Sequence, residues 1–212
     1  EDLPVDLNAL QGRLDLALVS TIVLDKQGAT KTLDYAINGV VQDFASTAPL
    51  QNHSIANGQL SFVASQAGYR VAGQAEVDGL GANLVIEGKL EEGAPPPELL
   101  LSATLDADEL KQMGFDASDF ISGQVEFVAR PMPDGSIQMA VDLEDASLTI
   151  EDLGITKARG RAGTLRAAVM QKGTLTELRQ IAVAFDDVNL AGSLEFDSEK
   201  GLQAAEFSSF AL

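Results

Sequence analysis

The sequence contains no cysteine and no tryptophan, and among its 212 residues it has one histidine and only 14 basic side chains against 32 acidic ones. The absence of cysteine excludes a disulfide framework, a thiolate nucleophile and a cysteine-based zinc site, but it leaves the redox compartment open. The net charge of −18 would repel a nucleic-acid backbone, so nucleic-acid binding is nearly excluded. The sequence contains no run of 18 apolar residues, the length expected of a transmembrane helix. The 45% hydrophobic content nevertheless favours a folded chain.

Apolar and polar residues alternate most clearly over residues 123–150. Val125, Phe127 and Ala129 fall on one face of a predicted strand, and polar side chains occupy the other face. Residues 131–135 contain prolines and a glycine, which are typical of a reverse turn between antiparallel strands. The pattern returns over 137–143 and again over 146–150, which predicts a three-stranded meander.

The same alternation predicts strands elsewhere, near 12–24, 33–42, 55–64, 69–77, 84–90, 99–105, 165–169, 181–185, 190–196 and 207–210. Residues 45–53 are predicted to be a loop, because Ser, Thr, Pro and Asn cluster there without a period. One short helix is predicted over 106–113, where Asp106 and Glu109 have the spacing of a capping box.

The predicted strands group into modules. We expect a first β-hairpin module over 1–54, a second meander module over 55–105, and the helix with a third and a fourth meander module over 106–212. The octapeptides at 58–65 and 123–130 agree at five of eight positions, which favours true repetition, although chance recurrence of short β-sequences is the alternative. Repeats that stack on their neighbours predict an elongated sheet, and the chain is expected to be a segment of a longer repeat protein.

The sequence shows no arrangement of residues that is typical of an enzyme active site. His53 would have to serve any Ser-His-Asp or histidine-metal mechanism alone, from a predicted loop. The acidic pairs occur at predicted turns, where solvated side chains are the favoured interpretation. The basic loop Lys157–Arg161 has the charge to meet a phosphate headgroup, but a plain surface loop is favoured. We therefore predict no catalytic residues, no metal site and no cofactor.

What is unusual is geometric. About a dozen predicted strands have one strongly apolar face, and a single short helix is available to cover it. Such a sheet must hide this face by curling or by stacking on another sheet, or keep it for an apolar ligand. The predicted fold class is all-β, a strongly curved antiparallel sheet of meander repeats with one short helix.

Over residues 55–212 the chain resembles the AsmA-like family of bacterial envelope proteins, and is most similar to its YhdP- and TamB-type members. The similar segments are Met113–Phe115, Ser122–Phe127, Asp134–Ser136, Val141–Leu143, Ala146–Leu148, Lys157–Gly160, Val188–Leu194 and Ala205–Phe210. The resemblance implies a bridge-like lipid-transfer protein, in which an inner-membrane anchor precedes a long, taco-shaped β-sheet. The apolar groove of that sheet would carry phospholipid across the periplasm towards the outer membrane.

Together, the apolar face and the resemblance predict a segment of a periplasmic lipid conduit. Its partners would be phospholipid, the inner membrane through an N-terminal anchor on the parent protein and, as a further candidate, an outer-membrane protein. The predicted groove residues are Leu60, Phe62, Val71, Leu84, Ile86, Val125, Phe127, Met139, Val141 and Leu148. The alternative is a structural or interaction module without a lipid ligand, either a closed sandwich or an assembly factor for outer-membrane proteins.

Overall fold

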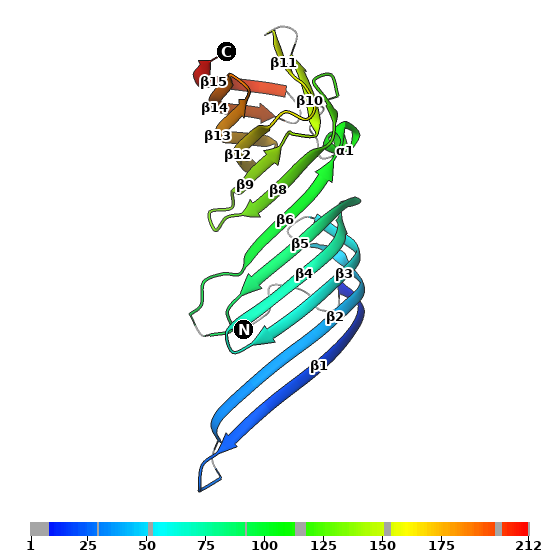
Figure 1. Ribbon diagram of the computed structural model, residues 1–212, viewed down its shortest axis with the longest axis vertical. Helices are drawn as coiled ribbons and strands as arrows, with labels where there is room; N and C mark the ends of the chain where they lie inside the picture. The colour runs from blue at the N-terminus through cyan, green and yellow to red at the C-terminus, as the bar shows by residue number, and fades with distance from the viewer. Residues whose placement is uncertain are drawn as a thin grey trace. The chain divides into compact units, whose positions relative to one another are not determined.

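A computed structural model of the chain describes residues 9–28, 30–50, 53–91, 93–112, 118–150, 154–197 and 201–211 (Figure 1). Of these residues, 74% are in β-strands and 4% are helical, with one short helix, so the predicted all-β class is confirmed. The chain forms two compact units, Glu1–Leu101 (unit 1) and Ser102–Leu212 (unit 2). Strand β6 (Glu98–Leu105) contains the point at which the units divide.

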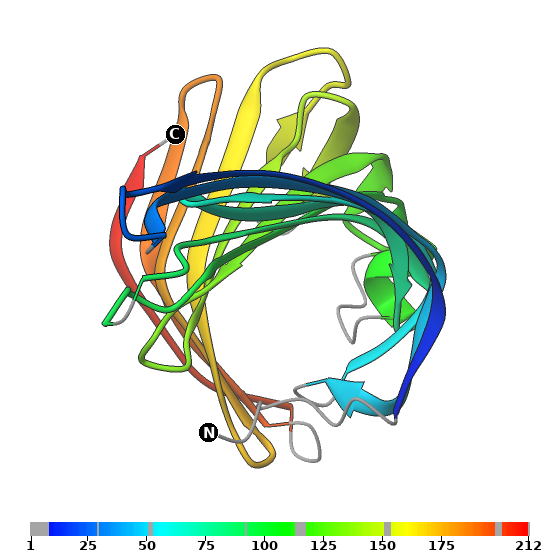
Figure 2. The ribbon, with the colours of Figure 1, turned by 90° about the horizontal axis from the view of Figure 1, so that it is seen from below.

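Unit 1 contains five antiparallel strands, each paired with the next along the chain. They are β1 (Leu10–Leu24), β2 (Thr30–Leu50), β3 (His53–Ser65), β4 (Gly68–Val77) and β5 (Leu80–Gly88). A tight turn at residues 25–28 joins β1 to β2. The Gly28 N–H donates to the Asp25 carbonyl at 3.1 Å, and Gly28 has a φ of 83° that a glycine adopts without strain. Figure 2 shows that the long strands of this unit bend strongly.

The predicted loop over residues 45–53 is wrong for most of its length. Strand β2 continues to Leu50 and β3 begins at His53. The pairing between them shifts register three times in this region, at Val41/Phe44, Phe44/Ser46 and Ser46/Leu50. Such irregularities let a strand continue while its alternation is lost, and for this reason the sequence pattern did not show it.

Unit 2 contains a six-stranded sheet and a smaller three-stranded one. The larger sheet has the order β8 (Val125–Pro131), β9 (Ile137–Asp142), β12 (Gly163–Lys172), β13 (Leu175–Phe185), β14 (Val188–Asp197) and β15 (Gly201–Ala211). The smaller has the order β11 (Ile155–Lys157), β10 (Ala146–Ile150) and β7 (Ile121–Gly123). We call the small sheet and helix α1 (Ala107–Gln112) the cap of unit 2.

The three-stranded meander predicted over 123–150 is only partly correct. Strands β8 and β9 pair as expected, but β10 leaves them and pairs with β7, with Ala146 opposite Gly123. Gly123 has a φ of 94°, and a Cβ there would lie 2.5 Å from the Asp145 carbonyl oxygen, so only glycine allows this approach. Strand β12 occupies the place beside β9 instead.

The cap packs on the large sheet of unit 2 through a small core. Leu105, Val125, Leu143 and Ala146 are at most 4% exposed, and Leu110 of the helix packs against them. The helix begins as predicted, because the Asp106 carboxylate accepts the Glu109 N–H at 3.0 Å and the Glu109 carboxylate accepts the Asp106 N–H at 2.9 Å. Met113, at the end of the predicted helix, lies outside the described residues.

Candidate functional site

The five groove residues predicted in unit 1 share one face of its sheet. Phe62 pairs with Val71 across β3 and β4, and Val71 pairs with Ile86 across β4 and β5. Leu60 and Leu84 lie two residues further along their strands, on the same side, because side chains two apart in a strand share a face. The structure therefore brings these five side chains together as a continuous apolar surface.

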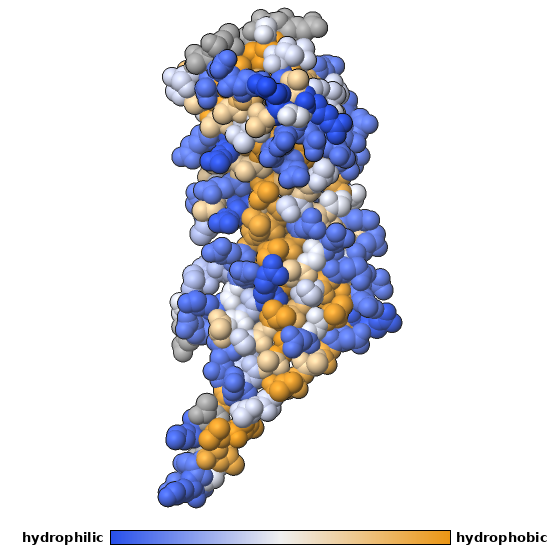
Figure 3. Space-filling view, in the orientation of Figure 1, coloured by the Kyte–Doolittle hydropathy of each residue, from blue (hydrophilic) through white to orange (hydrophobic). Residues whose placement is uncertain are grey.

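This surface continues across β2 and β1, which the predicted list of groove residues did not include. Leu16 pairs with Gly39, which pairs in turn with Phe62, and Leu18 pairs with Ile37 in the next row. We call the whole surface the apolar face of unit 1. Six of its large side chains on β1 and β2 are 45–65% exposed: Leu14, Leu16, Leu18, Ile22, Leu24 and Leu33. Figure 3 shows apolar residues at the surface of this long hairpin.

We infer from the burial of its side chains that the apolar face of unit 1 lies on the inside of the curved sheet. Among the residues described in unit 1, no helix or second sheet packs on this face, yet Leu60 and Leu84 are only 5% and 8% exposed. On a single sheet, burial of this degree requires that neighbouring side chains crowd together, as they do on a concave surface. On the opposite face, Arg70 and Glu87 are exposed, and so are Val19, Val40 and Val63. The apolar face is thus buried at Leu60 and Leu84 and stays open along β1.

At two positions of this face, a glycine leaves room for a large side chain on the neighbouring strand. A Cβ on Gly39 would lie 2.4 Å from the Leu16 Cδ2 atom, and a Cβ on Gly88 would lie 2.7 Å from the ring of Tyr69. Each large side chain therefore lies flat over the glycine opposite it, an arrangement known for aromatic residues paired with strand glycines. In the sequence, this arrangement is visible only as glycines at strand positions that the alternation assigns to the apolar face.

Unit 2 has a second apolar face, built by the same rule. Phe127 pairs with Val141 and Val141 with Leu165, while Met139 pairs with Ala129 in the adjacent row. The first row continues through Val183 and Leu190. Three of the predicted groove residues, Phe127, Met139 and Val141, therefore share this face.

Two other predicted groove residues in unit 2 have a different setting. Val125 is 2% exposed and belongs to the core beneath the cap, against which Phe127, Val141 and Leu165 of the apolar face also pack. Leu148 lies on β10 of the small sheet, where it pairs with Ile121 and Lys157, so its assignment to the meander face is wrong. The alternation of residues 146–150 predicted a strand but could not show which sheet would receive it.

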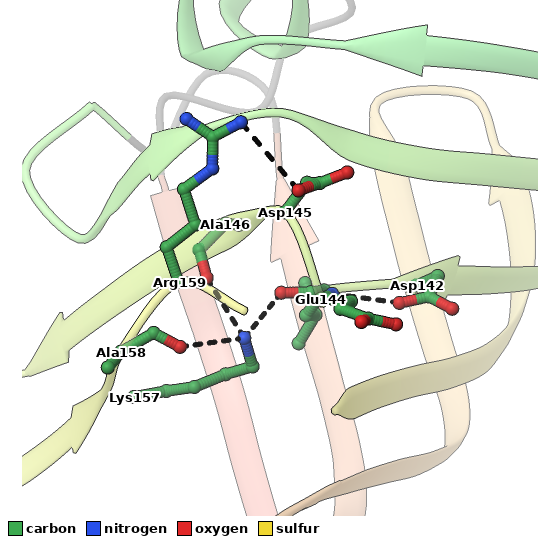
Figure 4. Close-up of polar contacts among 8 residues, drawn as sticks. Asp142, Glu144, Asp145, Ala146, Lys157, Ala158 and Arg159 are labelled. Carbon is green, nitrogen blue, oxygen red and sulfur yellow. Dashed lines mark hydrogen bonds and ion pairs between the residues drawn. The ribbon is translucent and has the colours of Figure 1, made fainter. Parts of the chain in front are cut away.

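Lys157 corrects the prediction that its basic loop is plain surface. Its side chain is fully buried, and its ammonium group donates to the carbonyl oxygens of Leu143 at 2.5 Å, Ala146 at 2.9 Å and Ala158 at 3.4 Å (Figure 4). The stem passes over Gly163, where a Cβ would lie 2.6 Å from the Lys157 Cε atom. Lys157 thus ties the turn between β9 and β10 to the segment after β11.

The two arginines of the same loop are engaged in ion pairs. Arg159 lies 3.6 Å from the Asp145 carboxylate, and the Arg161 Nε donates to Asp186 at 2.9 Å. The bond to Asp186 raises the pKa of the Arg161 guanidinium. This loop is occupied by intramolecular contacts, which disfavours a phosphate-binding role.

The described part of the chain contains no group of three or more His, Cys, Asp or Glu side chains arranged to hold a metal ion. The side chain of His53 lies outside the described residues. No helix in the described ranges is long and apolar enough to cross a membrane. Comparisons with protein-family models, curated proteins and solved structures gave no match for this chain. The two apolar faces are therefore the candidate functional site.

Proposed function

We propose that the apolar faces of the two units hold the acyl chains of phospholipids, and that the chain serves as a segment of a periplasmic lipid-transfer conduit between the inner and outer membranes. One observation carries this proposal. Six large aliphatic side chains on one face of β1 and β2 are 45–65% exposed, and no layer of described residues in unit 1 covers that face. Contiguous exposed apolar surface of this kind marks a binding site more often than plain surface.

The energetics suit an acyl chain. Burying a large aliphatic side chain stabilises by about 1.5–3 kcal/mol, and each buried CH₂ of a lipid contributes about 0.8 kcal/mol. A chain lying across these rows would therefore gain several kcal/mol even when covered on one side only. The headgroup would stay in water at the margin of the sheet. In this proposal no residue performs covalent chemistry.

The cellular setting follows from the family resemblance and is part of the proposal. Phospholipid would enter from the inner membrane, to which the parent protein would be anchored, and leave towards the outer membrane, where a membrane protein is a candidate partner. The net charge of −18 fits this setting, because a strongly acidic chain resists adsorption to anionic bilayer surfaces.

The alternative is a structural or interaction module, and one observation favours it for part of unit 2. Beneath the cap, Leu105, Val125, Leu143 and Ala146 form an ordinary closed core. This region needs no ligand. For the exposed leucines of β1, the alternative requires a protein partner in place of a lipid.

Two adjacent residues of β1 provide a test with a matched control. Leu18 and Val19 are 65% and 66% exposed, and they lie on opposite faces of the strand. Leu18→Glu places a carboxylate on the apolar face, whereas Val19→Glu places it on the other. Both variants should melt close to the wild type, because exposed substitutions usually change stability by less than about 0.5 kcal/mol.

Native mass spectrometry of the purified proteins then gives the readout. We expect co-purified phospholipid on the wild type and on Val19→Glu, and clearly less of it on Leu18→Glu. A wild-type protein that carries no phospholipid, or two variants that carry equal amounts, would contradict the proposed function.

A further inference from the structure

Strand β15 of unit 2 is an exposed sheet edge. Among the described residues it pairs with β14 alone, and every residue from Gln203 to Ser209 is exposed. Glu206 is the only charged residue of β15, which contains no proline. In unit 1, β1 has the same properties, because in the described residues it pairs with β2 alone and is exposed from Gln11 to Leu24. Edges with so little charge favour pairing with a further strand.

Phe207 carries the apolar face of unit 2 to the edge at β15. It pairs with Gly192, which lies two residues beyond Leu190 on β14 and therefore shares its face. Ala205, two residues before Phe207, is on this face too, whereas Glu206 is on the opposite one. Phe207 is 57% exposed. A strand added to β15 must therefore leave room for this ring and place no like charge opposite Glu206.

Strand β1 meets the charge condition. Leu14 lies on its apolar face, and Arg13 and Asp15 lie on the opposite face. An antiparallel partner that keeps the apolar faces on one side can shift only in steps of two residues. One such register places Arg13 opposite Glu206, whereas a step one way places Asp15 there and a step the other way places the neutral Gln11. The register with Arg13 is favoured, because opposite charges across a strand pair stabilise it and like charges destabilise it.

The same register fits the apolar side chains. It places Leu14 opposite Ala205 and Gly12 opposite Phe207. An aromatic residue across from an edge glycine is a recognised stabilising pair in sheets. Phe207 already forms such a pair on its other side, where a Cβ on Gly192 would lie 3.0 Å from the Phe207 Cδ1 atom.

Pairs of identical edges lack this match. Glu206 is the midpoint of β15, so two copies of β15 in full antiparallel overlap would place two glutamates opposite each other. Two copies of β1 overlapping fully about Ala17 would place Arg13 opposite Thr21, which forms no ion pair.

We propose that β1 of one copy of this chain pairs antiparallel with β15 of a second copy, with Arg13 opposite Glu206. This contact is head-to-tail, so an assembly keeps a free β1 at one end and a free β15 at the other. The inference goes beyond the proposed function, because it rests on two strand edges and not on lipid. In such an assembly the apolar face of unit 2 in one copy adjoins the apolar face of unit 1 in the next.

Disulfide crosslinking of the full chain tests the register, because the natural sequence contains no cysteine. Leu14→Cys and Ala205→Cys are made in separate proteins, one of them carrying a mass tag. Residues directly opposite have Cβ atoms about 4.5–5.5 Å apart, close to the spacing that a disulfide needs. Leu14 and Ala205 are exposed, so neither substitution disturbs a core. Leu18→Cys is the matched control, on the same face of β1 but about 13 Å out of register.

Under mild oxidation we expect the mixture of Leu14→Cys and Ala205→Cys to give at least about fivefold more heterodimer than the mixture of Leu18→Cys and Ala205→Cys. Equal heterodimer yields from the two mixtures overturn the pairing. So does a yield of homodimer from either Leu14→Cys or Ala205→Cys alone that exceeds the heterodimer yield.

A charge exchange tests the ion pair independently. In light scattering at low salt, Arg13→Glu and Glu206→Arg should each weaken association by about threefold or more, and the double variant should restore it. Arg130→Glu, an exposed position on β8, controls for the change in net charge and should have a smaller effect than Arg13→Glu. A double variant that associates no better than the single ones, or a wild type that stays monomeric, overturns the proposal.

Discussion

Lys157 buries an ammonium group among backbone carbonyl oxygens in unit 2. A buried charge is costly unless it is hydrogen-bonded, and here three carbonyls meet the three donors of the ammonium. The carbonyls of Leu143 and Ala146 belong to the turn where the chain leaves the large sheet for the small one. Lys157 therefore fixes the point at which the cap departs from β9.

Replacing Lys157 by methionine tests this role. Lys157→Met keeps an unbranched stem but removes the donors, so the Ala146 carbonyl loses its bond from Lys157 and the Leu143 carbonyl keeps only the Ala146 N–H. Each unsatisfied buried group costs about 1–3 kcal/mol, and the free energy of unfolding should fall by at least that much in urea titrations followed by circular dichroism. Arg159→Met, which removes an exposed ion pair, should stay within about 0.5 kcal/mol of the wild type. A Lys157→Met protein as stable as that control would contradict this account.

Glu177 is the second charged side chain with a defined role in unit 2. Its carboxylate is mostly buried and accepts a hydrogen bond from Lys172 at 2.9 Å, and it also pairs with Arg179. The bond from Lys172 lowers the pKa of Glu177 below its ordinary value of 4.5. Because the folded-state pKa is depressed, the stabilisation is present above the unfolded value and is lost as the pH falls through the folded one.

Melting temperatures measured between about pH 3 and pH 7 should show this loss. The wild type should be destabilised as the pH falls below about 4.5, and part of that slope should disappear in Glu177→Gln, which cannot ionise. The difference between the two proteins should be largest near neutral pH and smallest at the acid end. A constant difference across the range would show that Glu177 does not titrate as described.

Strand β1 is an exposed edge of the sheet of unit 1. In the described residues it pairs with β2 alone, every residue from Gln11 to Leu24 is exposed, and Arg13 and Asp15 are its only charges. Natural edge strands are usually protected by charges, prolines or bulges. An edge this long and this weakly charged favours pairing with another strand.

We therefore expect this chain to self-associate with rising concentration in light scattering. Adding charge to the edge with Val19→Lys and Val23→Lys, on the face away from the leucines, should reduce association without shifting the melting temperature. A wild-type chain that stays monomeric at high concentration would refute the prediction.

Alternation along the chain was sufficient to predict most strands, but not their partners. The period-two pattern predicted β8 and β9 together with the turn at Gly135, and Asp106 with Glu109 predicted the start of the helix. The pattern could not show that residues 146–150 join another sheet, because that choice depends on the backbone of Gly123 and on Lys157, far apart in the sequence. Bulges concealed the end of β2 for a related reason, since they break the alternation while the strand continues.

The sequence predicted which face of the sheet each candidate residue would lie on, but not how exposed it would be. Alternation placed nine of the ten predicted groove residues on the apolar side of a large sheet, and Leu148 was the exception. It did not show which of them would be buried and which open, because exposure depends on curvature and on the cap. The leucines of β1, which were not predicted, are 55–65% exposed, whereas Val125 is 2% exposed.

At the scale of the whole molecule, the central claim is that acyl chains lie on the apolar faces. Site-specific photo-crosslinking in cells tests it most directly, with a photoreactive side chain placed at Leu18 or Phe62 on the apolar face of unit 1, and at Val19 or Val63 on the opposite face. Phospholipid adducts at Leu18 and Phe62 but not at Val19 and Val63 are the predicted result. Adducts at none of the four positions, or equally on both faces, would contradict the claim.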